Sequence, residues 1–160
     1  FRAEAAMVEY VDTNLVEWKP VTLDDLVPVG LMTKTLRIDP DTQDRTWLNT
    51  IAPGWNREGN LSRRESHPVV EEMYQLAGVL AGDRGVLHPG AYFWRPPEVA
   101  HGPYGTRTGY LAILRCKGGP LVNRWTEAEH PFTFSPVHAP DLPPELEPYG
   151  RKAWTGGGVY

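Results

Sequence analysis

Short apolar runs separated by glycine, proline and aspartate recur along most of the chain. The runs alternate apolar with polar residues or are rich in β-branched and aromatic residues, a pattern that favours strands over helices. Between 69 and 116 runs and turns follow one another at roughly 8–12 residues, as in an all-β sandwich or barrel. The strands that this pattern predicts cover 14–21, 29–39, 46–53, 69–77 and 108–116.

Helical segments are expected to be few and short. Proline and glycine each supply 16 of the 160 residues, so breakers interrupt the chain every few positions. A short N-terminal helix is predicted over 1–13, and a single helical turn over 22–27 with Thr22 as its cap. The segment 39–45 is predicted to be a turn, and the polar segment 59–67 to be irregular.

The composition changes after Gly118 and Gly119, where proline and aromatic residues become dense and periodicity is lost. We expect one domain over 1–160, with a core at about 29–118 and an extended C-terminal arm over 119–160. The arm either packs across the barrel or onto a partner subunit, or it forms a partly ordered tail. The sequence leaves these alternatives open.

The stretch HPVVEEMYQLAG, residues 67–78, is compatible with a helix or with a strand. On a helix His67 and Glu71 would share one face, whereas on a strand Glu71 and Glu72 would point to opposite faces. The β-branched and aromatic content and the turn residues that follow favour the strand. One face of this strand then carries Glu71, Met73, Gln75 and Ala77, and the other carries Val70, Glu72, Tyr74 and Leu76.

Charge and cysteine content narrow the range of functions. The net charge is −4 and the sequence has no basic stripe, so nucleic acid is not an expected partner. No apolar run approaches the length of a membrane span, and no signal-like segment is visible. A single cysteine, Cys116, is typical of a reducing compartment. These features lead us to expect a soluble protein of the cytoplasm without membrane partners.

A carboxylate on a core-facing strand position needs a partner, because an isolated buried charge is costly. His67, Glu71 and His101 flank a meander that brings its two ends onto adjacent strands. Two imidazoles and one carboxylate inside a small barrel form a facial set of ligands for a divalent metal such as Fe(II), Mn(II), Ni(II) or Zn(II). Such a set leaves positions open for water or substrate.

The spacing of these residues is similar to that of the cupin superfamily. His67, three residues, Glu71, six residues and Gly78 follow the first cupin motif. Gly90, five residues, the triplet 96–98, two residues and His101 follow the second. The resemblance covers about 45–116 and is closest to small single-domain cupins, including acetylacetone-cleaving dioxygenases and anti-sigma-factor cupin domains. It implies a double-stranded β-helix (a jelly-roll barrel), His67, Glu71 and His101 as metal ligands, and a homodimer.

The sequence departs from the cupin pattern at three places. Glu65 stands where the first motif has its first histidine, Pro96-Pro97-Glu98 replaces Pro-x-Gly, and Gly105 stands where an asparagine is frequent. Glu65 is then a fourth ligand, or the metal has three protein ligands, or the site binds no metal. Alternatively, Glu65 is a solvent-exposed loop residue. A carboxylate in place of imidazole favours harder ions such as Mn(II) or Fe(II).

Further residues are candidates for the wall of a substrate pocket, although each is also compatible with ordinary barrel core. Gln75 stands out because a polar group on an inner face needs a partner. Arg95 would bind a substrate carboxylate if it points inward and would be a solvated charge if it points outward. His88, His130 and His138 are expected to be surface or structural residues. The substrate-binding candidates are Met73, Gln75, Tyr92, Trp94 and Arg95.

Three functions are compatible with this set. The first is an oxygenase in which Fe(II) binds a small enolisable or chelating substrate and O2. The second is a lyase, isomerase or hydrolase in which Glu65 or Tyr110 moves a proton beside a Lewis-acidic metal. The third is a non-enzymatic module that binds a metal or small ligand. The fold alone does not separate them.

Overall fold

The computed structural model describes residues 11–21, 31–55 and 63–130, and within these ranges the chain is all-β. No helix in the described part is long and apolar enough to cross a membrane. The strands of the described residues are β1 Lys19–Pro20, β2 Leu31–Ile38, β3 Arg45–Ile51, β4 Arg63–Ser66, β5 Val70–Gly78, β6 Leu80–Gly82, β7 Gly85–Leu87, β8 Tyr92–Arg95, β9 Tyr104–Gly105, β10 Tyr110–Lys117 and β11 Arg124–Glu129.

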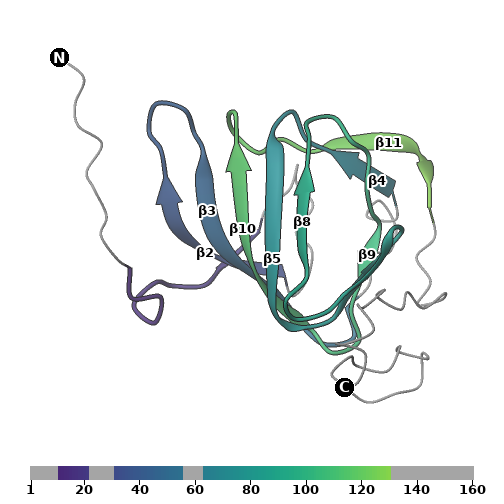
Figure 1. Cartoon of the computed structure of the whole chain (residues 1–160), viewed down its shortest axis with the longest axis horizontal. Coiled ribbons are helices and arrows are strands. Elements are labelled where there is room, and N and C mark those ends of the chain that lie inside the picture. The colour runs from purple at the N-terminus through teal and green to yellow at the C-terminus, as the bar shows by residue number, and fades with distance from the viewer. Residues whose placement is uncertain (1–10, 22–30, 56–62, 131–160) are drawn as a thin grey trace, which may run out of the picture.

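The strands form one large sheet and two small ones. The large sheet has the antiparallel order β1-β2-β3-β10-β5-β8. The small sheets have the orders β11-β4 and β7-β6-β9. Figure 1 shows the large sheet curving through the molecule, with β4, β11 and β9 beyond β8. This jelly-roll barrel confirms the all-β fold expected from the spacing of the apolar runs.

Strand β5 confirms that the stretch 67–78 forms a strand and not a helix. Glu71, Met73 and Gln75 are buried, while Tyr74 and Leu76 are exposed. The prediction for Ala77 is wrong, since this residue is exposed. The register of β5 and β10 shifts between Leu111 and Ala112, so one residue of β5 is left unpaired there and the alternation of faces ends at Gln75.

Gly78, the glycine of the first motif, lies where β5 leaves the large sheet. Its φ is +69°, and a Cβ built on it would lie 2.0 Å from the carbonyl oxygen of Gly109. Only glycine allows both this conformation and this close approach of two backbones. The contact lets the chain pass from the large sheet into β6.

The remaining predictions divide into confirmed, wrong and untested. Strands over 29–39, 46–53 and 108–116 are confirmed as β2, β3 and β10. Of 14–21 only Lys19–Pro20 is a strand, because the preceding residues form turns. The helix over 1–13 falls mainly, and the turn over 22–27 entirely, outside the described residues.

Two segments are more ordered than the sequence indicated. The segment 59–67 was expected to be irregular, but Arg63–Ser66 is strand β4. Its partner is β11, in the first part of the arm, where Trp125 lies opposite Glu65. The described start of the arm therefore packs across the barrel. Both elements depend on a pairing between residues far apart in the sequence, which local patterns do not reveal.

Candidate metal centre

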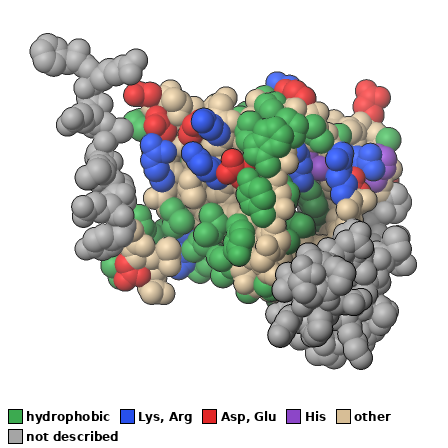
Figure 2. All heavy atoms as spheres, in the orientation of Figure 1, with side chains coloured by type: hydrophobic (Ala, Val, Ile, Leu, Met, Phe, Trp, Pro, Cys, Tyr) green, Lys and Arg blue, Asp and Glu red, His purple; other side chains and the backbone are tan. Residues whose placement is uncertain are grey.

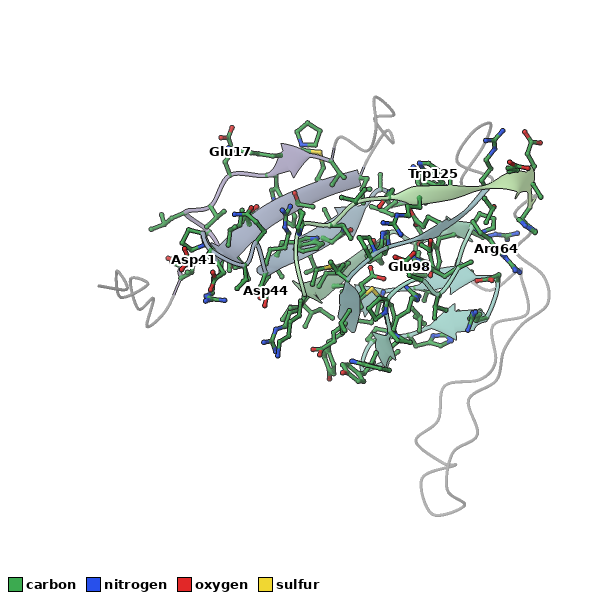
Figure 3. All side chains as sticks on the ribbon, turned by 90° about the horizontal axis from the view of Figure 1, so that it is seen from above. Glu17, Asp41, Asp44, Arg64, Glu98 and Trp125 are labelled. Atoms are coloured by element: carbon green, nitrogen blue, oxygen red, sulfur yellow. The ribbon has the colours of Figure 1, made fainter. Side chains whose placement is uncertain are left out.

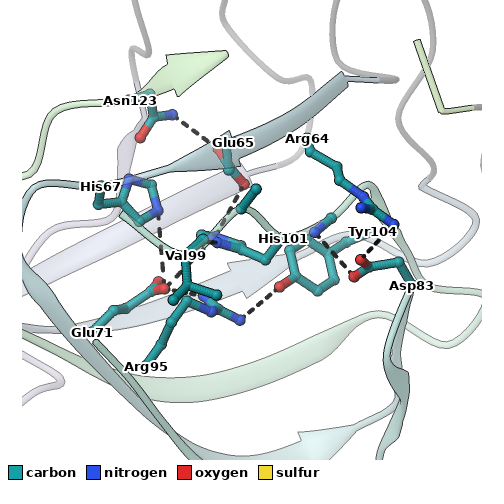
Figure 4. Close-up of polar contacts among 12 residues, drawn as sticks. Arg64, Glu65, His67, Glu71, Asp83, Arg95, Val99, His101, Tyr104 and Asn123 are labelled. Atoms are coloured by element: carbon teal, nitrogen blue, oxygen red, sulfur yellow. Dashed lines mark hydrogen bonds and ion pairs between the residues drawn. The ribbon is translucent and has the colours of Figure 1, made fainter. Parts of the chain in front are cut away.

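Glu65, His67, Glu71 and His101 meet inside the barrel (Figure 4). All four side chains are buried. Glu65 lies on β4 and forms a two-way backbone bridge with His101, with N–O distances of 2.9 and 2.8 Å. His67 follows β4 directly, and Glu71 lies on β5. Glu65 is therefore an inner-face strand residue and not a loop residue in solvent.

The ligand atoms of this cluster surround a common point. The Nε2 atom of His101 lies 3.8 Å from Oε2 of Glu71 and 3.9 Å from Oε1 of Glu65. Nε2 of His67 lies 3.9 Å from the same Glu71 oxygen. One ligand atom from each of Glu65, His67 and His101 falls within 4.8 Å of the others. These separations are longer than hydrogen bonds and suit donors that share an ion at about 2.1 Å.

Backbone contacts fix the tautomer of both histidines. Nδ1 of His101 lies 2.9 Å from the carbonyl oxygen of Val99, and Nδ1 of His67 lies 3.2 Å from that of Val122. A carbonyl oxygen only accepts hydrogen bonds, so each Nδ1 is the donor and carries the hydrogen. In the neutral ring the lone pair is then on Nε2, which faces the carboxylates. This is the usual arrangement of metal-binding histidines, and the donor set fits a divalent cation.

Burial shifts the ionisation of His101 and Glu71 toward their neutral forms. It lowers the pKa of His101 to about 3, with a further contribution from the positive charge of Arg95, so the imidazole is neutral at neutral pH. Burial also raises the pKa of Glu71, although Arg95 and His67 oppose this shift. A neutral imidazole is the form that binds a metal ion.

Arg95 points into the barrel, which places it with the substrate-pocket candidates and not at a solvated edge. It donates through Nη1 to Oε2 of Glu71 and through Nη2 to the hydroxyl of Tyr104, the latter at 2.9 Å. Its orientation follows from the register, because Arg95 lies directly opposite Glu71 and Phe93 opposite Met73. Opposed residues of an antiparallel pair share one face of the sheet.

The same register shows that Tyr92 and Trp94 were wrongly assigned to the pocket. They lie on the outer face of β8, where their side chains are 58% and 55% exposed. The stretch Tyr92–Arg95 consists of large side chains only, so its pattern gives no indication of which residues face inward. The pairing with β5 determines it.

The cluster opens onto a cavity of about 320 Å³. Two of the substrate-binding candidates, Met73 and Arg95, are among its lining residues, together with Tyr110, the candidate for proton transfer. Gln75 is fully buried but is not a lining residue, and its amide nitrogen donates to the carbonyl oxygen of Ala77 at 2.9 Å. Much of the remaining wall is apolar, formed by Leu31, Trp47, Ile51, Trp55, Leu80 and Leu114.

Sequence reasoning missed several polar residues of the cavity wall, and three of them form hydrogen bonds within the site. Asn49 accepts a hydrogen bond of 2.6 Å from the hydroxyl of Tyr110, Tyr104 accepts from Arg95, and Asn123 donates to Glu65 at 3.0 Å. Asn123 lies far along the chain in the arm, where no motif marks it. Asn49 is a polar residue on the buried face of β3, and that alternation is the one signal that could have identified it.

The departure from Pro-x-Gly at Glu98 is compatible with the fold. Glu98 has a φ of +65°, the conformation for which glycine is usual, and its backbone nitrogen donates to the carbonyl oxygen of His67 at 2.7 Å. The loop of the second motif therefore supports the histidine of the first.

Solved structures with the same fold include proteins described as dioxygenases and one described as a cyclase. A protein of Methylibium petroleiphilum PM1, provisionally described as an acetylacetone dioxygenase, is 15% identical, covers 79% of this chain and 94% of its own, and has a TM-score of 0.61. An acetylacetone dioxygenase from Acinetobacter johnsonii is 12% identical, with coverages of 78% and 89% and a TM-score of 0.58. The polyketide cyclase RemF from Streptomyces resistomycificus is 18% identical, with coverages of 77% and 89% and a TM-score of 0.57.

At these identities the structural likeness establishes the fold alone. No curated protein matches the sequence. A family model does match, over residues 6–120, and it describes the ChrR Cupin-like domain. This match spans most of the chain and agrees with the motif spacing and with the barrel. The chain therefore belongs to the ChrR-like cupin domain family.

Proposed function

We propose that this cupin is a metal-dependent enzyme, and specifically a dioxygenase that acts on a small enolisable or chelating organic substrate. The observation that supports the proposal is the cluster itself: two imidazole Nε2 atoms and two carboxylates lie together at a cavity whose wall is partly polar and partly apolar. A cavity of about 320 Å³ suits a small ligand, since small-molecule sites begin near ~300 Å³.

His67 and His101 would hold the ion through Nε2, and Glu65 and Glu71 would hold it through carboxylate oxygens. When bound, a divalent metal, Fe(II) first and Mn(II), Zn(II) or Ni(II) as alternatives, would supply Lewis-acid polarisation of a chelated substrate and, if redox-active, chemistry with O2. Carboxylate ligands favour the harder ions of this group. The metal remains a proposal, supported by the donor set.

The surrounding residues of the chain would bind and shield the substrate. The guanidinium of Arg95 reaches the cavity beside Glu71 and offers a positive charge to an enolate or carboxylate oxygen. The aromatic and aliphatic wall, which includes Trp47 and Leu114, excludes water from the reacting atoms.

A redox-neutral reaction is the second candidate, and one observation favours it. Tyr110 lines the cavity and its hydroxyl donates to Asn49, so it is held in one orientation from which it can move a proton to or from a bound substrate. A lyase, isomerase or hydrolase would use Tyr110 or Glu65 in this way. A cupin that binds a metal or ligand without catalysis is the third alternative.

Oxygen consumption separates these functions. Protein reconstituted with Fe(II) without air is screened in an oxygen electrode against acetylacetone, other β-diketones and small enolisable acids. We expect substrate-dependent oxygen uptake that His101→Ala abolishes. The matched control His130→Ala changes a histidine outside the cluster and should leave uptake unchanged.

Other outcomes assign the site differently. Substrate loss without oxygen uptake, supported equally by Zn(II) or Mn(II), would establish the redox-neutral alternative. Uptake that survives in His101→Ala would contradict the assignment of the site.

A further inference from the structure

The segment between β10 and β11 contacts two of the candidate ligands, and Figure 4 shows the contact from Asn123 to Glu65. The backbone carbonyl oxygen of Val122 accepts a hydrogen bond from Nδ1 of His67 at 3.2 Å. The side-chain amide nitrogen of Asn123 donates to Oε2 of Glu65 at 3.0 Å. These partners lie 55 and 58 positions apart in the sequence. The arm therefore supports the site, and neither cupin motif includes these two residues.

The orientation of the Asn123 amide follows from its partner. An ionised carboxylate only accepts hydrogen bonds, so the nitrogen, and not the oxygen, faces Glu65. Oε2 of Glu65 accepts this hydrogen bond. The other carboxylate oxygen, Oε1, faces Nε2 of His101 at 3.9 Å. The two oxygens of Glu65 thus have different neighbours.

The Oδ1 end of the Asn123 side-chain amide provides a second observation. The Oδ1 atom of Asn123 is buried, and within the described part of the chain it has no hydrogen-bond partner. A buried acceptor without a partner destabilises the folded state. Such an atom in a native fold calls for an explanation, and among the described residues the hydrogen bond of this amide goes to Glu65.

We propose that Asn123 is a positioning residue that restricts Glu65 to binding the metal through Oε1 alone. The inference rests on the proposed metal site. A carboxylate that replaces a histidine can offer both oxygens to an ion, and the second oxygen would then occupy a coordination position. By engaging Oε2, Asn123 makes Glu65 a one-atom ligand like the imidazole it replaces, and it keeps a position open for substrate.

The variant Asn123→Leu tests this role with Co(II) as the probe. It removes the donor and keeps the volume of the side chain. Loss of the contact should weaken Co(II) binding about tenfold in competition with a chelator, as for other contacts that orient metal ligands. The visible absorption of the Co(II) protein should weaken as Glu65 binds through both oxygens. Azide, a small added ligand, should bind the variant more weakly because its position is filled.

Two further variants separate positioning from general damage. Glu127→Gln changes an exposed side chain of β11 that lies outside the cavity wall, so it should match the wild type in all three readouts. Asn123→Gln retains an amide donor and should recover part of the affinity and spectrum. If circular dichroism shows that Asn123→Leu does not fold, Asn123→Gln tests the proposal in its place.

The outcomes distinguish this inference from the proposed function. A wild type that binds Co(II), together with leucine and glutamine variants of unchanged affinity, spectrum and azide binding, would overturn the role of Asn123 and leave the metal site intact. A wild type that binds no metal would overturn both.

Discussion

The two faces of strands β5 and β8 reverse the usual distribution of residues. The inner face is buried and carries Glu71 and Arg95 beside Met73, while the outer face exposes Tyr74 and Trp94. Figure 2 shows hydrophobic side chains gathered in the middle of the face in view. Exposed apolar residues are common in proteins, but buried charges are rare unless they are paired or bind a metal. The inner face is therefore the one shaped by function.

The contrast is sharpest on β10, where neighbouring residues point to opposite faces. Cys116 is fully buried, and burial raises the pKa of its thiol, whereas Arg115 is exposed. We expect iodoacetamide to label Cys116 at least about 1000-fold more slowly in the folded than in the unfolded protein. In the variant Arg115→Cys with Cys116→Ser, the cysteine should label at nearly the unfolded rate. Equal rates for both cysteines in folded protein would contradict the assignment of faces.

Truncation of adjacent side chains on β5 gives the next largest difference. Met73 is 3% exposed and Tyr74 is 46% exposed. Met73→Ala should lower the free energy of unfolding by about 3 kcal/mol, because it leaves a gap in a packed wall. Tyr74→Ala should cost about 1 kcal/mol. Urea unfolding of both variants measures the difference, and the reverse order would show that β5 is turned the other way.

The charged pair on the inner face is tested by the variants Arg95→Met and Arg115→Met. Removal of Arg95 leaves the buried Glu71 without its cation, which should cost about 2 kcal/mol, with the loss limited by protonation of the carboxyl. Arg115→Met, on the outer face, should stay within about 0.5 kcal/mol of the wild type. If Glu71 is a ligand, Zn(II) should restore more stability to the Arg95 variant than to the Arg115 variant.

The smallest effect is expected from a partly exposed charge far from the cluster. Figure 3 shows Asp44 on the same side of the molecule as Asp41, away from Glu98. A backbone hydrogen bond from Gly118 holds the pKa of Asp44 below its ordinary value of 3.8. The ionised form therefore favours folding, and this contribution is complete above a pH of about 4 and is lost as the pH falls through the folded pKa.

Asp44→Asn should consequently lower stability slightly at pH 7 and not at pH 2. Asp41→Asn, in the same loop, is the control and should match the wild type at both values. Urea unfolding at the two pH values measures this, and an equal loss at both would exclude the ionic origin of the effect.

The difference between the faces also explains how much the sequence could predict. The motif spacing located His67, Glu71 and His101, and local alternation located β5. The inward side of β8 was assigned wrongly at Tyr92 and Trp94, since four consecutive large residues carry no alternation. Its orientation comes from pairing with another strand.

The motif spacing marked Glu65 as a possible ligand, but long-range pairing decides where the rest of the site lies. Glu65 faces inward because β4 pairs with β11, and Asn123 reaches it from the arm. No local pattern encodes either contact. The homodimer, the cytoplasmic location and the assignment of 1–160 to one domain stay predictions.

The most direct test of the account is the metal content of protein purified without a metal-affinity tag, measured by mass spectrometry of the elements in the wild type and in His67→Ala. The account predicts about one divalent ion per chain in the wild type, after reconstitution if necessary, and none in the variant. A wild type that holds no metal even after reconstitution, or a variant that holds as much as the wild type, would contradict it.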